Sequence, residues 1–155
     1  MNCLREIDER GFALAKTQGE IFEESVYKGT PSYFFILSFM RSRGASIMDS
    51  ASLEDPSFSK ETALQEALEG TSVSKGQVYS PNEMHWIGYV YRIISYCYEI
   101  RSIKLVKLVP PSYLRSVYLP YHTLDPVKAA GLVLEERGVK LLSKEEKIKM
   151  IFKRK

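Results

Sequence analysis

The sequence has little cysteine, and this scarcity narrows its covalent and metal chemistry. Only two cysteines occur among the 155 residues, Cys3 near the N-terminus and Cys97 within an apolar segment. Small secreted domains that cannot build a sufficient core are rich in disulfide bonds, so we expect no disulfide framework here and a reducing, cytoplasmic environment. No cysteine and histidine residues follow the spacing of a zinc site, and the sequence predicts neither a metal ion nor a cofactor.

Long hydrophobic runs are also lacking. The longest, residues 33–40, is interrupted only by Ser38, whereas a membrane-spanning helix needs about 20 apolar residues. The first ten residues, MNCLREIDER, are too charged for the apolar centre of a signal peptide. We therefore expect a soluble protein that has no membrane partner.

The composition that is present is typical of one globular domain. Hydrophobic residues make up 45% of the chain and charged residues 26%, and a chain of 155 residues is long enough to bury a core. The formal net charge of +3 is unevenly placed, because residues 140–155 contain seven basic and two acidic side chains. This pattern predicts a near-neutral helical domain over residues 1–139 and a basic C-terminal helix or tail over residues 140–155.

Hydrophobic periodicity predicts an all-α fold, a single compact domain of about six to seven helices around a central buried helix at residues 81–100. The clearest helix start is Ser80-Pro81-Asn82-Glu83, where a cap, a proline at the first position and a capping-box glutamate coincide. Residues 102–109 suit either a short helix or a strand, and Pro111 opens a further turn or two toward Tyr118. The other expected helices cover residues 4–26, 31–44, 59–69, 126–137 and a terminal stretch from Ser143, with residues 45–58 and 70–79 irregular. The second of them is apolar nearly all round between Tyr33 and Met40, so we expect it to be buried. Ser59 and Asp125 are predicted helix caps, and Gly70 is a predicted helix end.

The central segment MHWIGYVYRIISYCYEI (84–100) has two different faces when its residues are placed at 100° intervals. Trp86, Ile93 and most other apolar residues fall on one broad arc. The opposite side carries a narrow strip of roughly 80°, which we call the polar aromatic strip and which consists of His85, Tyr89, Arg92, Tyr96 and Glu99. Gly88 and Ser95 lie beside this strip and would allow another backbone to approach closely.

Three interpretations of the polar aromatic strip remain open from the sequence. Another helix of the same chain could cover it, which would make Arg92 and the tyrosines ordinary packing residues. Tyrosine, tryptophan and arginine also dominate the energetics of protein interfaces, so the strip could bind a partner protein. His85 together with His122 could instead perform acid–base chemistry, although no spacing indicates a nucleophile and no catalytic residue is assigned.

The segment YLPYHTLDP (118–126) is a second group of polar aromatic residues. Its Tyr121 and His122 precede a predicted helix N-terminus, whose free amides can bind an anion, or they simply pack a tight loop before the helix. The candidates for partner or ligand binding are therefore His85, Tyr89, Arg92, Tyr96, Glu99, Tyr121 and His122.

The basic tail could contact nucleic acid through charge alone. The candidate residues are Lys149, Lys153, Arg154 and Lys155. No helix-turn-helix with a basic recognition helix accompanies them, so a solvated basic chain end is the simpler interpretation.

Three blocks of sequence together resemble a known family. They are FFILSFMRSRGASIMD (34–49), SPNEMHWIGYVYRIISYCYE (80–99) and YLPYHTLDPVKAAGLVLEE (118–136), and they resemble small bacterial proteins encoded in toxin–antitoxin-like gene clusters. In that pattern Phe-Met-x-Ser leads to Met-Asp, and a Trp-Ile-Gly-Tyr-x-Tyr-Arg helix precedes a Tyr-x-Pro-Tyr-His-Thr-Leu-Asp-Pro segment. The matching residues are Phe39, Met40, Ser42, Met48, Asp49, Trp86, Ile87, Gly88, Tyr89, Tyr91, Arg92, Tyr118, Pro120, Tyr121, His122, Thr123, Leu124, Asp125 and Pro126.

The resemblance covers most of residues 34–136 and implies the neutralising partner of a toxin, with an ADP-ribosyltransferase-like toxin as one expectation. It supplies no catalytic residues. We therefore expect a non-enzymatic, antitoxin-like module that binds its cognate toxin directly. Two alternatives stay open: an enzymatic or toxic member of such a pair, which would use a pocket of His85, Tyr89, Arg92 and His122, and a DNA-binding autoregulator that uses the tail. The sequence does not indicate whether the chain forms a homo-oligomer.

Overall fold

The computed structural model describes residues 3–50 and 55–140 of the chain. Within these residues there are nine helices and no strand, which confirms the all-α prediction and exceeds the expected number of helices. None of these helices joins the length and the apolar character that crossing a bilayer requires. The helix predicted from Ser143 and the basic candidates of the tail lie outside the described residues.

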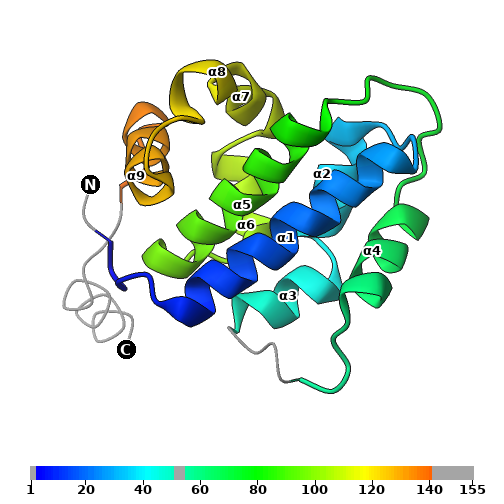
Figure 1. Ribbon diagram of the computed structural model, residues 1–155, viewed down its shortest axis with the longest axis horizontal. Coiled ribbons are helices and arrows are strands. Elements are labelled where there is room, and N and C mark those ends of the chain that lie inside the picture. Colours follow the sequence, from blue (N-terminus) through cyan, green and yellow to red (C-terminus); the bar gives the residue numbers. More distant parts are fainter. Residues whose placement is uncertain (1–2, 51–54, 141–155) are drawn as a thin grey trace, which may run out of the picture.

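The helices pack around a central pair. Figure 1 shows α1 and α5 side by side across the middle of the molecule, and this pair makes the most extensive helix contact. Helices α7, α8 and α9 lie to one side of the pair, and α2, α3 and α4 lie to the other. The helix bounds are α1 (Glu9–Tyr27), α2 (Ser32–Met40), α3 (Arg43–Asp49), α4 (Lys60–Glu69), α5 (Pro81–Tyr98), α6 (Ser102–Leu108), α7 (Pro111–Ser116), α8 (Tyr118–Tyr121) and α9 (Pro126–Glu136).

The central helix α5 begins where the sequence predicts and ends in an unusual way. The side chain of Ser80 accepts a hydrogen bond from the Glu83 amide at 3.2 Å, and Glu83 accepts one from the Ser80 amide at 3.3 Å, so the capping box is confirmed. The helix then continues unbroken to Tyr98. Glu99 follows in the left-handed region, with φ of 53°, a conformation that glycine usually supplies at helix ends. The expected final residue, Ile100, therefore lies beyond the helix.

The contact between α1 and α5 depends on small residues, as expected for Gly88. A Cβ atom on Gly88 would lie 2.8 Å from the carbonyl oxygen of Gln18 and 2.8 Å from Cγ of Phe22. Gly19 on α1 meets α5 in the same way, because its Cβ would lie 3.0 Å from the carbonyl oxygen of His85. The two helix backbones thus approach closely over this stretch.

Two predicted helix boundaries were wrong, and capping side chains explain both. Helix α1 begins at Glu9 instead of residue 4, because the carboxylate of Asp8 accepts a hydrogen bond from the Gly11 amide at 2.9 Å. Helix α2 ends at Met40, and Ser42 caps a new helix through the Ala45 amide at 3.2 Å. Residues 43–49, expected to be partly a helix end and partly irregular, form α3.

The other expected helices within the described residues are present, with ends that differ from the prediction by one residue at most. Ser59 caps α4 and Gly70 ends it, while Asp125 caps α9. Residues 102–108 form a helix, which removes the strand alternative. Pro111 opens α7, and the short α8 is an addition that the sequence did not predict as a separate helix.

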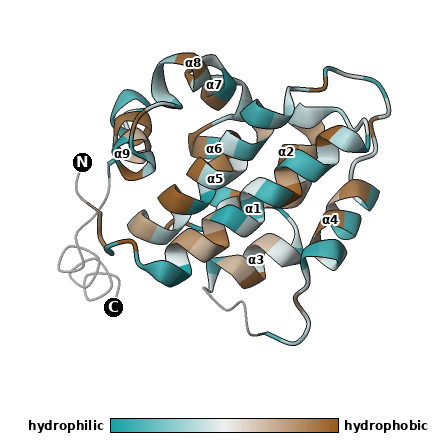
Figure 2. Ribbon diagram, in the orientation of Figure 1, coloured by the Kyte–Doolittle hydropathy of each residue, from teal (hydrophilic) through white to brown (hydrophobic). Residues whose placement is uncertain are grey.

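The core is continuous and includes residues of almost every helix. Figure 2 shows hydrophilic and hydrophobic residues alternating around α1, α4 and α9, the pattern of helices with one apolar side. The prediction that α2 is buried all round was too strong. Phe35, Ile36 and Phe39 are fully buried, but Tyr33 and Phe34 each remain 38% exposed.

The close contact of α1 with α5 predicts a strong effect of one added methyl group. Gly88→Ala places this group where the Gln18 carbonyl already lies, so we expect the free energy of unfolding to fall by roughly 1–3 kcal/mol. Urea denaturation followed by circular dichroism measures it. Asn82→Ala, on an exposed position of the same helix, is the control and should change stability by no more than about 0.5 kcal/mol. A Gly88→Ala protein as stable as the wild type would contradict the close backbone contact.

Candidate functional site

The polar aromatic strip is not one continuous surface, because α1 lies along it. Arg92 is 1% exposed and Tyr96 is 7% exposed, so these two candidates belong to the interior and not to an open binding face. His85 and Tyr89 are half-buried, and Glu99 is exposed. Another helix of the same chain therefore covers the part of the strip that contains Arg92 and Tyr96, which is one of the three interpretations given above.

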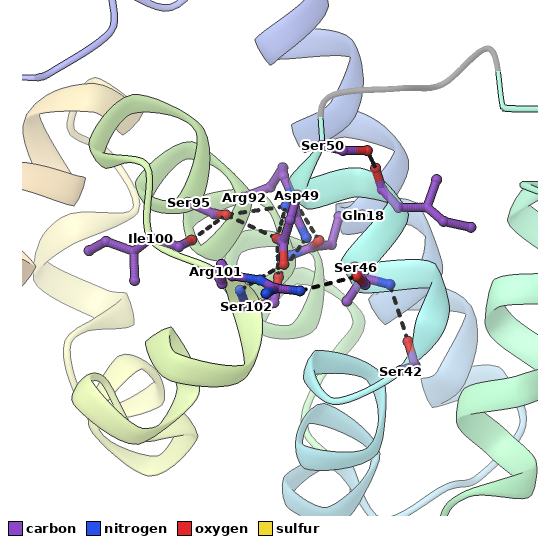
Figure 3. Close-up of polar contacts among 12 residues, drawn as sticks. Gln18, Ser42, Ser46, Asp49, Ser50, Arg92, Ser95, Ile100, Arg101 and Ser102 are labelled. Carbon is purple, nitrogen blue, oxygen red and sulfur yellow. Dashed lines mark hydrogen bonds and ion pairs between the residues drawn. The ribbon is translucent and has the colours of Figure 1, made fainter. Parts of the chain in front are cut away.

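The guanidinium of Arg92 is the centre of a buried polar cluster, drawn in Figure 3. Nε donates to Oε1 of Gln18 on α1 at 2.8 Å, and Nη1 donates to Oδ1 of Asp49 at the end of α3 at 2.7 Å. Nη2 donates to the hydroxyl of Ser102 on α6 at 2.9 Å. One side chain of α5 therefore joins three other helices.

The carboxylate of Asp49 neutralises Arg92 and also begins α6. Its Oδ2 accepts a hydrogen bond from the Ser102 amide at 3.0 Å, and its Oδ1 accepts one from the Ser102 hydroxyl at 2.6 Å. Arg101, at the N-cap position of α6, makes no side-chain cap. Asp49 thus supplies from another helix the cap that the local sequence lacks.

The cluster is fully hydrogen-bonded. Gln18 also donates from Nε2 to the carbonyl oxygen of Gly88 at 2.9 Å, and the Ser95 hydroxyl donates to the carbonyl oxygen of Ile100 at 2.6 Å. No buried side-chain nitrogen or oxygen in the described part of the chain lacks a partner. Burial lowers the pKa of the Arg92 guanidinium, and the charge of Asp49 opposes that shift.

The partners of Arg92 were not predicted from the sequence. Arg92 and Glu99 share the polar aromatic strip, but Glu99 lies 3.6 Å from Nη2 of Arg5, at the surface. The available signal was Gln18, a long polar side chain within the apolar stripe of α1. A hollow of about 280 Å³ borders the cluster and is lined by Arg5, Met48, Asp49, Arg92, Ser95, Tyr96, Glu99, Ile100 and Arg101. Because internal partners already occupy the Arg92 guanidinium, it is not presented to a ligand.

The candidates His85, Tyr89 and His122 belong to a set of partly exposed rings on α5 and around α8, which falls into two groups. The rings of His85 and Tyr89 stack with centroids 6.3 Å apart, and the Trp86 ring meets the edge of Tyr118 at 5.7 Å. Tyr118 in turn stacks on His122 at 4.4 Å. We call this group the aromatic face: His85, Trp86, Tyr89, Tyr118 and His122. His122 is exposed and the other four are half-buried.

Each histidine of the aromatic face has its own polar partner. Nδ1 of His85 lies 3.0 Å from Oε1 of Glu23 on α1. Nδ1 of His122 lies 2.8 Å from the carbonyl oxygen of Tyr118 and 3.0 Å from that of Leu119, so it donates within its own turn. These contacts fix the ring orientations and hold the face in one arrangement.

A second hollow adjoins the aromatic face, with a volume of about 620 Å³. Tyr118 borders both, and the wall of the hollow includes Arg115, which lies over the Tyr79 ring at 4.2 Å and donates to Glu83 at 3.0 Å. Leu119 stands at its edge and is 77% exposed. Tyr121, the remaining candidate, is half-buried and packs against the core.

Comparison with known proteins adds no homologue. No protein-family model, curated protein or solved structure matches the chain. Within residues 3–50 and 55–140, no group of three or more histidine, cysteine, aspartate or glutamate side chains is placed to hold a metal ion. The aromatic face and its adjoining hollow are therefore identified from the geometry of this structure, without support from a homologue.

The buried pair of Arg92 and Asp49 predicts a large and asymmetric effect on stability. Asp49→Ala leaves the guanidinium buried without a counter-charge, so we expect the free energy of unfolding to fall by roughly 3–5 kcal/mol. Replacing both charges, with Arg92→Met and Asp49→Leu together, should cost less than Asp49→Ala alone, because no unpaired charge remains. Urea denaturation of each variant measures the difference.

The control for these variants is the half-exposed ion pair of Lys60 with Glu20, whose charged atoms lie 3.0 Å apart, compared with 2.7 Å for Arg92 and Asp49. Lys60→Gln should cost no more than about 1 kcal/mol. If Asp49→Ala were as mild as Lys60→Gln, the buried cluster would not contribute to the stability of the fold in the way its geometry indicates.

Proposed function

We propose that the chain is an antitoxin-like protein-binding module, which neutralises a partner toxin by direct contact through the aromatic face and its adjoining hollow. The observation that carries this proposal is a set of five partly exposed rings in two groups, His85 with Tyr89 and Trp86 with Tyr118 and His122, each joined by ring contacts. The resemblance of the sequence to proteins of toxin–antitoxin-like gene clusters supports the same function.

The chemistry of the face suits a protein partner. Tyrosine, tryptophan and histidine combine a large apolar ring with a polar tip, so they bury area and make hydrogen bonds in the same contact. Leu119 adds an apolar side chain that stands in water beside a hollow. Tyrosine and tryptophan side chains near the centre of an interface often contribute most of its binding energy.

The face is also held in place before binding. The stacks of His85 on Tyr89 and of Tyr118 on His122 restrict side chains that would otherwise lose rotamer freedom on association. Because ordering each mobile side chain costs roughly 0.5–1.5 kcal/mol, a prearranged face retains more of its contact energy as affinity.

Co-expression with the product of the adjacent gene tests the role. We expect that product to arrest growth when it is expressed alone, and this chain to relieve the arrest and to co-purify with it. A neighbouring product that neither arrests growth nor binds this chain would overturn the antitoxin-like function.

Two surface substitutions test the face itself. Tyr89→Ala and Leu119→Ala should each raise the Kd for the partner at least about tenfold, or about 1.4 kcal/mol, in a titration by calorimetry. Ile103→Ala on α6 is the matched control, since Ile103 is 47% exposed but lies outside the face, and its Kd should equal that of the wild type. Wild-type affinity for both face variants would place the partner elsewhere on the molecule.

A further inference from the structure

The two cysteines of the sequence lie against each other, although they are far apart in the chain. The amides of Leu4 and Arg5 both donate to the carbonyl oxygen of Cys97, at 2.8 and 2.9 Å, so the segment that carries Cys3 is fixed on the last turn of α5. The side chain of Cys3 packs against the core cluster that contains Cys97, and its proximity contributes to the raised pKa of the Cys97 thiol. Both cysteines are free thiols, Cys97 fully buried and Cys3 half-buried.

We propose that Cys3 and Cys97 form an oxidation site, at which a peroxide closes an intramolecular disulfide between the N-terminal segment (residues 3–8) and the central helix. The inference goes beyond the proposed protein-binding function and does not depend on it. A disulfide bond requires two cysteines whose backbones lie side by side, and the hydrogen bond from the Leu4 amide to the Cys97 carbonyl oxygen holds the backbone next to Cys3 against Cys97.

The reaction begins at Cys3, because that sulfur is the accessible one. The thiolate of Cys3 attacks one oxygen of hydrogen peroxide, so an S–O bond forms and the O–O bond breaks, and the departing hydroxide takes a proton to become water. Cys3 is then a sulfenic acid. Burial, together with the neighbouring Cys3, raises the pKa of Cys97 to about 12, so Cys97 is not the sulfur that peroxide attacks first.

The second step uses Cys97 as the resolving thiol. Its sulfur attacks the sulfur of Cys3, an S–S bond forms and the S–O bond breaks, and the departing hydroxide takes the proton of the Cys97 thiol. In total, two thiols and one hydrogen peroxide give one disulfide and two waters. An external dithiol reverses the reaction by thiol–disulfide exchange.

Non-covalent contacts already hold the N-terminal segment in the geometry that the disulfide would fix. The Tyr96 hydroxyl donates to Oδ1 of Asp8 at 2.7 Å, and the Arg5 guanidinium lies 4.6 Å from the centre of the Tyr96 ring. Cys3 also lies close enough to Tyr98 to contribute, after burial, to the raised pKa of the Tyr98 hydroxyl. The disulfide would therefore add a covalent link to an existing contact and leave the fold unchanged.

Peptide mapping of the peroxide-treated full chain tests the bond directly. Trypsin cuts after Arg5, Arg92 and Arg101, so Cys3 lies in residues 1–5 and Cys97 in residues 93–101. We expect these two peptides to appear linked and lighter by two hydrogen atoms, in the monomeric fraction of a non-reducing gel. Closing so long a loop should raise the Tm by roughly 10 °C, and dithiothreitol should abolish both changes.

The Cys3→Ser variant is the control, because Cys3 is only half-buried and its replacement leaves the core intact. Its Tm should not change with peroxide, and Cys97 should react with iodoacetamide once the variant is unfolded. In Cys97→Ala, dimedone should label Cys3 as a sulfenic acid that cannot be resolved. The proposal is overturned if both wild-type thiols remain alkylatable after peroxide treatment, if the linked peptides come only from dimers, or if Cys3 is overoxidised while Cys97 stays free.

Discussion

A buried guanidinium brings a full charge and several N–H groups into the core, and each of these needs a partner. In this protein the partners of Arg92 come from three other helices, Gln18 of α1, Asp49 of α3 and Ser102 of α6. Since a buried charge without a partner is strongly destabilising, the positions of these helices relative to α5 are coupled. The helices described here thereby gain a specific arrangement that apolar packing alone would define less strictly.

The two ends of the polar aromatic strip differ in how far the rest of the protein buries their side chains. Near Arg92 and Tyr96, α1 approaches closely and the side chains face inward. Near His85 and Tyr89 the side chains remain partly accessible, although α1 still approaches the α5 backbone there through Gly19. One amphipathic helix thus contributes both to the internal packing and to the surface proposed to bind a partner.

Local signals in the sequence predicted most of the fold. The capping box at Ser80 and Glu83, the cap at Asp125 and the helix stop at Gly70 are all decided by a few adjacent residues, and the structure confirms each. The partners of Arg92 depend on tertiary geometry, because Asp49 and Gln18 are 43 and 74 residues away from it. The pattern of α5 could therefore identify which side chains share a side of the helix, but not which part of that side another helix covers.

The cap that Asp49 provides to α6 couples the local opening of two segments that are remote in sequence, the end of α3 and the start of α6. When α3 opens locally, the Ser102 amide loses its acceptor and the Arg92 guanidinium loses its counter-ion at the same moment. Neither segment can then fluctuate alone, since opening one removes the polar partners of the other. Amide hydrogens at the end of α3, the start of α6 and the middle of α5 should accordingly exchange with solvent as one cooperative unit, whereas the exposed turn of α8 should exchange independently of them.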